Sequence, residues 1–206
     1  MLINPYSKLP LNMINILEKC VSEWNVGMKT SILGFCYHPY NYIPLRNKSG
    51  GVAEAFAGMY VSMTNSHVEN PHPDGYPDIL PNNEEARSWI EIPTLEDFKG
   101  EGGFDMKSVY VNSKIDTNAT AHHKFTTSVM NVIWTFKDNT PQIIGITYAD
   151  DLIKDDWGTP SMGFSGSKTT PCCSVNKFGK KKLRAGWVLL EENLKLRSKE
   201  DWINYG

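Results

Sequence analysis

The sequence lacks any long uninterrupted apolar run, and this absence excludes one large class of proteins. No stretch reaches the roughly 18 apolar residues that a transmembrane helix needs, so we expect no membrane span. The first residues also lack a basic region followed by an apolar core, so we expect no secretory signal. With 206 residues, 40% of them hydrophobic, the chain has the length and composition of one sizeable globular domain.

Cysteine is also scarce. The four cysteines are Cys20, Cys36, Cys172 and Cys173, and two of them are adjacent. Such a set does not make a disulfide framework in a chain of this length, which favours reduced thiols in a cytoplasm. A zinc site is disfavoured as well, because there is no Cys-x₂-Cys pair and adjacent cysteines rarely ligate one ion.

The net charge is small, at −2, but the charges are unevenly distributed. Residues 69–105 contain ten acids and two bases, whereas residues 168–184 contain six bases and no acid. An acidic middle segment can hold metal ions and a basic segment can hold phosphates. A solvated acidic loop and a solvated basic hairpin would have the same composition, so both interpretations stay open.

The pattern of apolar residues predicts one domain, residues 1–206, that mixes helices and strands. There is no internal repeat and no low-complexity tract. We expect helices over residues 9–26, 52–63 and 121–136. We expect strands over residues 89–92, 104–112, 141–149 and 187–190, the last in a hairpin. The order strand, helix, strand over residues 104–149 predicts a crossover unit within one sheet.

At the strand expected over residues 104–112, the stretch over residues 103–111 carries an acid and a lysine on one face. Phe104 and Met106 alternate with Asp105 and Lys107, which is the period of a half-buried strand. Two residues apart on a strand, the carboxylate and the ammonium emerge side by side. Placing such a pair near a core is costly, so it indicates a site that uses a metal ion or a phosphate.

A second acid, Asp78, follows Pro77 and lies 27 residues before Asp105. Two carboxylates holding one or two Mg²⁺ ions supply most of what phosphodiester hydrolysis needs. A nearby lysine can orient the attacking water and stabilise the developing negative charge. Asp78, Asp105 and Lys107 are therefore candidate catalytic residues. The metal ligands would be the two carboxylates and the backbone carbonyl of Met106.

Pro77-Asp78 and Asp105-Met106-Lys107, followed by Ser108, resemble the motif of the PD-(D/E)xK nuclease superfamily, and of type II restriction endonucleases in particular. The resemblance covers residues 51–149. It implies an α/β fold, restriction-endonuclease-like, with a mixed central β-sheet flanked by helices. The first acid would begin one strand and the acid-x-lysine would lie on the next. It also implies a further catalytic acid on a preceding helix; Glu54 is the match and Glu69 the alternative.

The chain contains rivals for both halves of this motif. Asp97-Phe98-Lys99 also fits the second half, but a proline precedes it and glycines follow, which is typical of a loop. Pro73-Asp74 also fits the first half, but Gly75 follows Asp74, whereas an apolar strand start follows Asp78. We therefore favour Asp78 and Asp105. An exposed turn acid and an exposed edge-strand pair remain the structural alternative.

Residues 157–190 form a predicted DNA-recognition region, in a loop or hairpin, because small hydrogen-bonding side chains alternate there with cations. Its candidate DNA-binding residues are Lys168, Thr169, Thr170, Asn176, Lys177, Lys180, Lys181, Lys182 and Arg184. A flexible basic loop is the alternative.

At the start of the predicted helix over residues 121–136, His122, His123 and Lys124 are candidates for a phosphate contact. The two histidines with Asn131 also resemble an HNH nuclease, but that site needs another His or Asn on a following helix and no histidine follows His123. Exposed polar residues at a helix start remain equally compatible with this stretch.

These expectations combine into one functional hypothesis, a Mg²⁺-dependent type II restriction endonuclease that cleaves double-stranded DNA. By resemblance, the products would carry 5′-phosphate and 3′-hydroxyl ends and the protein would be prokaryotic and cytoplasmic. A homodimer is expected because a two-fold symmetric protein reads a palindrome economically. The alternatives are a structure-specific repair or recombination nuclease of the same superfamily and a DNA-binding protein without activity.

Overall fold

The structure, a computed structural model, describes residues 1–30, 45–72, 75–92, 97–112, 120–121, 127–138, 140–159 and 173–192. In this part of the chain, no helix is both long enough and apolar enough to cross a membrane.

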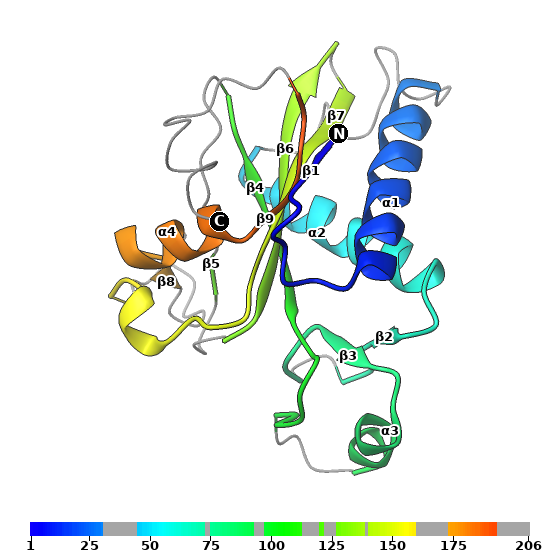
Figure 1. The fold of residues 1–206 in the computed structure, drawn as a ribbon, viewed down its shortest axis with the longest axis vertical. Helices are drawn as coiled ribbons and strands as arrows, with labels where there is room; N and C mark the ends of the chain where they lie inside the picture. Colours follow the sequence, from blue (N-terminus) through cyan, green and yellow to red (C-terminus); the bar gives the residue numbers. More distant parts are fainter. Residues whose placement is uncertain are drawn as a thin grey trace.

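A five-stranded mixed sheet organises the described residues (Figure 1). In spatial order its strands are β1 (Leu2–Ile3), β9 (Trp187–Leu190), β7 (Thr140–Ala149), β6 (Val129–Lys137) and β4 (Asp105–Tyr110). The edge strand β4 runs parallel to β6, and the other neighbours are antiparallel. The chain is therefore a mixed α/β protein, which confirms the expected fold class at this level.

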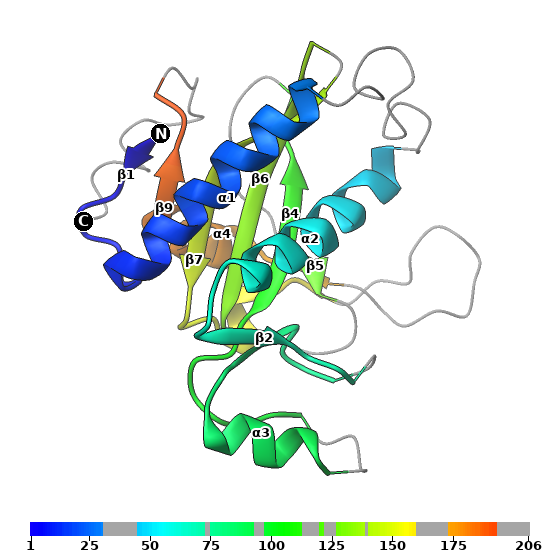
Figure 2. The same ribbon diagram turned by 90° about the vertical axis from the view of Figure 1, so that its right-hand side faces the viewer.

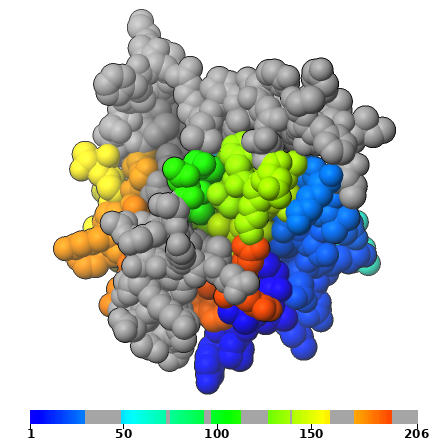
Figure 3. Space-filling model, turned by 90° about the horizontal axis from the view of Figure 1, so that it is seen from above, coloured from blue at the N-terminus to red at the C-terminus, as the bar shows by residue number. Residues whose placement is uncertain are grey.

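Helices cover both faces of this sheet. The long helices α1 (Leu11–Thr30) and α2 (Leu45–Ser62) lie on one face, and α4 (Lys177–Ala185) lies on the other (Figures 1 and 2). Viewed from above, Figure 3 shows the same order, with α4 at one side, the strands in the middle and α1 at the other side. The short helix η3 (Lys154–Asp156) packs beside α4.

The alternation of side chains along β4 separates two apolar layers. Met106 belongs to the large core under α1 and α2, which also contains Met130 and Ile146 of the neighbouring strands. Asp105 and Lys107 point to the opposite face because successive side chains of a strand alternate. On that face, Leu183 of α4 packs in a smaller core against β6 and β7.

A small unit extends from the end of the sheet where β4 begins. It contains the antiparallel pair β2 (His67–Glu69) and β3 (Ile79–Pro81), followed by helix α3 (Glu84–Ile90). Leu80, Ala86 and Phe98 form its own apolar cluster. A further two-residue pair, β5 (Thr120–Ala121) and β8 (Cys173–Ser174), lies near α4.

Most of the predicted elements are present with shifted ends. The helices expected over residues 9–26 and 52–63 correspond to α1 and α2, and the latter begins seven residues earlier, at Leu45. The strands expected over residues 104–112, 141–149 and 187–190 correspond to β4, β7 and β9. The described residues around Pro71, Pro77 and Pro81 lie in strands, bends or irregular backbone, which suits the fixed φ of proline.

The strand predicted over residues 89–92 was wrong, because Trp89 and Ile90 end helix α3. Asn83 caps this helix: its side chain accepts a hydrogen bond from the backbone N–H of Ala86 at 2.8 Å. Two acids in the first turn add favourable charge at the helix N-terminus. These signals outweigh the short apolar pattern that favoured a strand.

The helix predicted over residues 121–136 was also wrong, and with it the crossover helix. Val129 to Phe136 lie in β6, which pairs with β4 on one side and β7 on the other. The segment is rich in β-branched and aromatic residues, which favour strands. Its first six residues are buried, so the apolar run has no alternation that would distinguish a strand from a buried helix. The two flanking strands do share one sheet, as expected.

The expected loop or hairpin of the basic region contains a helix instead. Residues 177–185 form α4, which Asn176 caps by accepting hydrogen bonds from the backbone N–H groups of Phe178 and Gly179. Because α4 ends at Ala185, β9 follows a helix and pairs with β7 and β1. The cations of residues 177–184 therefore lie on helix α4.

Candidate active site

The two halves of the predicted motif meet where β3 and β4 touch. Ile79 and Phe104 form an isolated antiparallel bridge, with N···O distances of 3.1 and 3.0 Å. Asp78 immediately precedes β3 and Asp105 is the first residue of β4. Gly103 permits this close approach, because a Cβ at that position would lie 2.5 Å from the Pro77 ring. The backbone therefore brings two acids 27 residues apart into contact.

Cross-strand hydrogen bonds fix both carboxylates. The backbone N–H of Asp78 donates to Oδ1 of Asp105 at 3.1 Å, and the backbone N–H of Met106 donates to Oδ2 of Asp78 at 3.0 Å. The side chain of Asp105 is fully buried, whereas that of Asp78 is 37% exposed. One carboxylate is therefore held rigidly inside the protein and the other faces solvent.

Lys107 lies between the two carboxylates. Its Nζ donates to Oδ2 of Asp78 at 3.0 Å and lies 3.8 Å from Oδ2 of Asp105. Burial lowers the pKa of Lys107, but the charges of Asp105 and Asp78 raise it by more, so the pKa lies above its usual value. The side chain is therefore an ammonium at neutral pH, able to donate hydrogen bonds to an anion or to water.

A cleft of about 650 Å³ reaches this cluster from one side. Asp105 lines it together with Tyr76, the loop over residues 97–103, Thr127, Ser128 and Tyr148. Burial raises the pKa of both Tyr76 and Tyr148, so both side chains are neutral phenols at physiological pH. The cleft is large enough for part of a polymer substrate and offers hydroxyl groups beside the acidic cluster.

A second cavity of about 250 Å³ reaches the same cluster from the side of α2. Asp78 and Met106 line it together with Glu54 of α2 and Glu69 of β2. Glu69 lies close to the helix, because a Cβ added at Gly58 would be 3.2 Å from its Oε1. The predicted helper acid Glu54 and its alternative Glu69 thus border one space with Asp78.

The donor set is compatible with a hard divalent cation bound in part by the substrate. Among the described residues, no group of three or more His, Cys, Asp or Glu side chains is arranged to hold a metal. Asp78 and Asp105 supply two carboxylates, and Mg²⁺ is usually bound by one or two carboxylates together with waters and phosphates. The residues present therefore match Mg²⁺ better than a metal that needs an all-protein cage.

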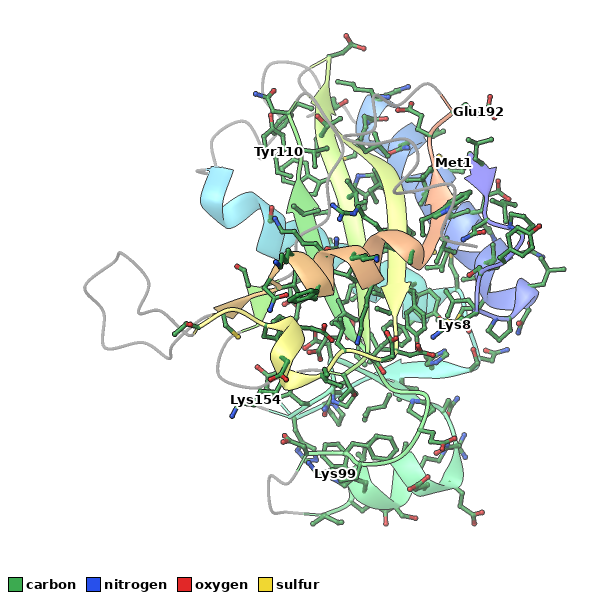
Figure 4. All side chains as sticks on the ribbon, turned by 60° about the vertical axis from the view of Figure 1, so that its left-hand side comes forward. Met1, Lys8, Lys99, Tyr110, Lys154 and Glu192 are labelled. Atoms are coloured by element: carbon green, nitrogen blue, oxygen red, sulfur yellow. The ribbon has the colours of Figure 1, made fainter. Side chains whose placement is uncertain are left out.

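The rival residues Asp97 and Lys99 are not part of the acidic cluster, although they border the same cleft. Asp97 and Lys99 sit on the rim of the 650 Å³ cleft, 3.8 Å apart, and the Lys99 side chain is 83% exposed. Figure 4 places Lys99 beside the small unit that contains α3, below the end of the sheet. Asp97 and Lys99 belong to no helix or strand, in agreement with the loop predicted for them. Asp74 lies outside the described residues.

The α4 residues predicted to bind DNA have unequal surroundings. Lys177 and Lys181 are exposed, with Nζ of Lys177 at 4.9 Å from the ring centroid of Phe178. Lys182 instead donates to Oδ2 of the buried Asp156 at 2.7 Å. The side chain of Asn176 is occupied in capping the helix. Exposure therefore singles out Lys177 and Lys181 within the set.

The other α4 candidates, Lys180 and Arg184, are partly buried. His122, His123, Lys124, Lys168, Thr169 and Thr170 lie outside the described residues, so their predicted roles stay predictions.

The cleft tyrosines Tyr76 and Tyr148 were not among the site residues predicted from the sequence. Tyr76 stands directly before Pro77-Asp78, so its position next to the motif was a usable signal. Tyr148 comes from the far strand β7, and only the pairing of β7 with β6 brings it to the cleft.

Comparisons of the chain with known protein families, with curated proteins and with solved structures found no match.

Proposed function

We propose that this protein is a Mg²⁺-dependent endonuclease that hydrolyses phosphodiester bonds in double-stranded DNA. The observation that carries the proposal is the convergence of Asp78, Asp105 and Lys107 at the start of two touching strands. This is the arrangement that the resemblance to the PD-(D/E)xK nucleases implies. We further propose the type II restriction class, a homodimer and a restriction-endonuclease-like fold.

Asp78 and Asp105 would hold the metal, with the Met106 carbonyl as a further oxygen ligand. The buried Asp105 is fixed by the backbone of Asp78, so this ligand is preorganised. Bound Mg²⁺ would supply charge neutralisation and an activated water. Glu54 and Glu69 border the cavity next to Asp78 and can receive water molecules of the metal shell.

Lys107 would serve as a hydrogen-bond donor. Its ammonium now neutralises the two carboxylates, and a metal ion would take over that role. The ammonium would then be available to the attacking water and to a phosphate oxygen. A preorganised donor at the point where negative charge develops accelerates such reactions by about 10²–10³-fold.

DNA would be held outside the acidic cluster by cations around it. The exposed lysines Lys8 and Lys154 lie near the end of the sheet where β4 begins, whereas Tyr110 marks the opposite end of that strand (Figure 4). Helix α4 adds Lys177 and Lys181 on the same face of the sheet as Asp105. Contacts of this kind go to phosphates and confer affinity without sequence preference.

Digestion of a plasmid of known sequence tests the function. With Mg²⁺, we expect discrete linear fragments, and mapping of the ends should give 5′-phosphates at one short repeated sequence. With EDTA or with Ca²⁺ in place of Mg²⁺, cleavage should stop. Smears, or cuts confined to junctions and ends, would indicate a structure-specific nuclease. Sequence-selective binding with no cleavage at any Mg²⁺ or Mn²⁺ concentration would contradict the proposal.

The contribution of α4 is tested by the salt dependence of binding. In Lys177→Ala/Lys181→Ala, we expect the slope of log K against log [salt] to fall by about 1–2 if both ammonium groups neutralise phosphates. Binding should be measured with Ca²⁺ so that DNA stays intact. The control is Lys19→Ala/Lys29→Ala on α1, which covers the opposite face and should keep the original slope. Equal slopes in the two double variants would exclude α4 from the DNA interface.

A further inference from the structure

One row of side chains crosses the sheet beside the candidate active site. In the strand register, Lys107 of β4 is the partner of Asn131 of β6, and Asn131 is the partner of Thr147 of β7. Partners in register point to the same side of a sheet. Asn131 and Thr147 therefore lie on the face that carries Asp105 and Lys107, opposite α1 and α2.

Within β6 and β7 this row is polar, whereas the residues of the two rows beside it are apolar in both strands. Asp105 is the partner of Val129, which pairs with Ala149, and on the other side Val109 is the partner of Ile133. Val129 and Ile133 belong to two separate apolar clusters. Asn131 and Thr147 therefore stand between two apolar clusters, in a position where an apolar pair would fit the surroundings.

Both side chains are completely buried, and no described residue offers them a hydrogen bond. Asn131 and Thr147 are each 0% exposed. Among the described residues, the side-chain oxygen and nitrogen of Asn131 and the hydroxyl of Thr147 have no hydrogen-bond partner. Buried polar groups are nearly always paired, with protein or with ordered water, because leaving them unpaired is costly. An amide and a hydroxyl that are neighbours on one face of a sheet are the kind of partners that hold a buried water.

The neighbouring lysine can use such a water. The Lys107 ammonium has three N–H donors, and among the described residues its carboxylate partners are Oδ2 of Asp78 at 3.0 Å and Oδ2 of Asp105 at 3.8 Å. A third acceptor would fix the rotation and the position of Nζ.

We propose that Asn131 and Thr147 are positioning residues, which orient Lys107 for phosphodiester hydrolysis through water that they hold beside it. The effect on hydrolysis rests on the proposed function, whereas the position of Asn131 and Thr147 next to Lys107 comes from the strand register. It explains why two polar side chains interrupt an apolar face at the row of the lysine.

The test uses Asn131→Leu/Thr147→Val, which replaces both polar groups by apolar groups of similar size. Such a replacement leaves stability equal or improved if no other bond is lost. We expect an unfolding midpoint at or above that of the wild type, an unchanged Kd for DNA in Ca²⁺, and a single-turnover cleavage rate lowered about 10- to 100-fold. Thr147→Ser keeps the hydroxyl and should restore most of the rate that Thr147→Val alone loses.

A structural role alone would give a different result. If the double variant and Thr147→Val cleave at the wild-type rate, the positioning role is wrong and the endonuclease proposal stands. If the double variant does not fold, the comparison of Thr147→Val with Thr147→Ser decides the question, because both keep Asn131.

A readout without cleavage separates the two proposals. A high-resolution crystal structure of the wild-type protein should contain an ordered water bonded to Asn131 or Thr147 and to Nζ of Lys107, and Thr147→Val should shift that water or Nζ. If the wild type cleaves no DNA, the proposed function fails and this structure still decides the inference. A direct bond between Asn131 and Thr147, with no water reaching Lys107, would overturn it.

Discussion

Replacing Asp105 by asparagine is expected to lower DNA cleavage by at least about 1000-fold, because it removes a metal-binding charge from the centre of the site. The asparagine oxygen can still accept the hydrogen bond from the backbone N–H of Asp78, so the strand junction should survive. The DNA affinity in Ca²⁺ should stay equal or increase slightly, since one negative charge is removed near phosphates. Lys107→Ala should lower the rate by about 10²–10³-fold through loss of the donor.

The chain provides its own matched control for this experiment. Asp97→Asn and Lys99→Ala change an acid-x-lysine pair of the same spacing that lies on the rim of the cleft. We expect cleavage by these two variants to stay within about fivefold of the wild type, since an ion pair with an exposed lysine contributes little. Single-turnover rates at saturating Mg²⁺ would decide between the two pairs. Equal losses for both pairs, or full activity in Asp105→Asn, would remove Asp105 from the active site.

Replacing Gly186 by alanine is expected to destabilise the protein by about 3 kcal/mol, through overpacking against a backbone that cannot move away. A Cβ at this position would lie 1.8 Å from the carbonyl oxygen of Tyr148. The same two residues are joined by a backbone hydrogen bond of 2.8 Å from Tyr148 N–H to the Gly186 oxygen. To accept the methyl group, β7 and the end of α4 must separate and weaken this bond.

A loss of this size should lower the midpoint of thermal unfolding by roughly 6–12 °C for a chain of this length. Gly27→Ala is the control: Gly27 is an exposed glycine in α1, and its added Cβ would meet nothing within 4 Å. This substitution should stabilise the protein by about 0.5–1 kcal/mol through the helix propensity of alanine. If both variants unfold at the wild-type temperature, the close packing of α4 against β7 is wrong.

Local signals in the sequence were sufficient for the strand that carries the site. The alternation over Phe104 to Lys107 predicted strand β4 and the shared face of Asp105 and Lys107. Both features depend only on residues that are close together in the chain. The contact between Asp78 and Asp105 followed only from the resemblance, since no local rule says which strand pairs with which. The loop assignment of Asp97 rested on proline and glycine punctuation and agrees with the structure.

Features that depend on pairing between distant strands could not be predicted. Residues 129–134 are buried on both faces, so the period that distinguishes helix from strand is absent there. The polar row of Lys107, Asn131 and Thr147 depends on the register of three strands, and a shift by one residue would turn Asn131 to the other face. The cleft tyrosine Tyr148 depends on the same register.

The bridge between Ile79 and Phe104 also bears on how this protein can change in evolution. Residues 82–103, which contain α3, leave the site after β3 and return to it at this bridge. An insertion or deletion near α3, away from Gly103, would leave Asp78 and Asp105 in contact, since the entropy of closing a loop grows only slowly with its length. Descendants of such a gene can therefore vary the distance between the two acids along the chain while keeping their distance in space. A search for related sequences should fix Asp105 and Lys107 at two residues apart and leave the interval to Asp78 free.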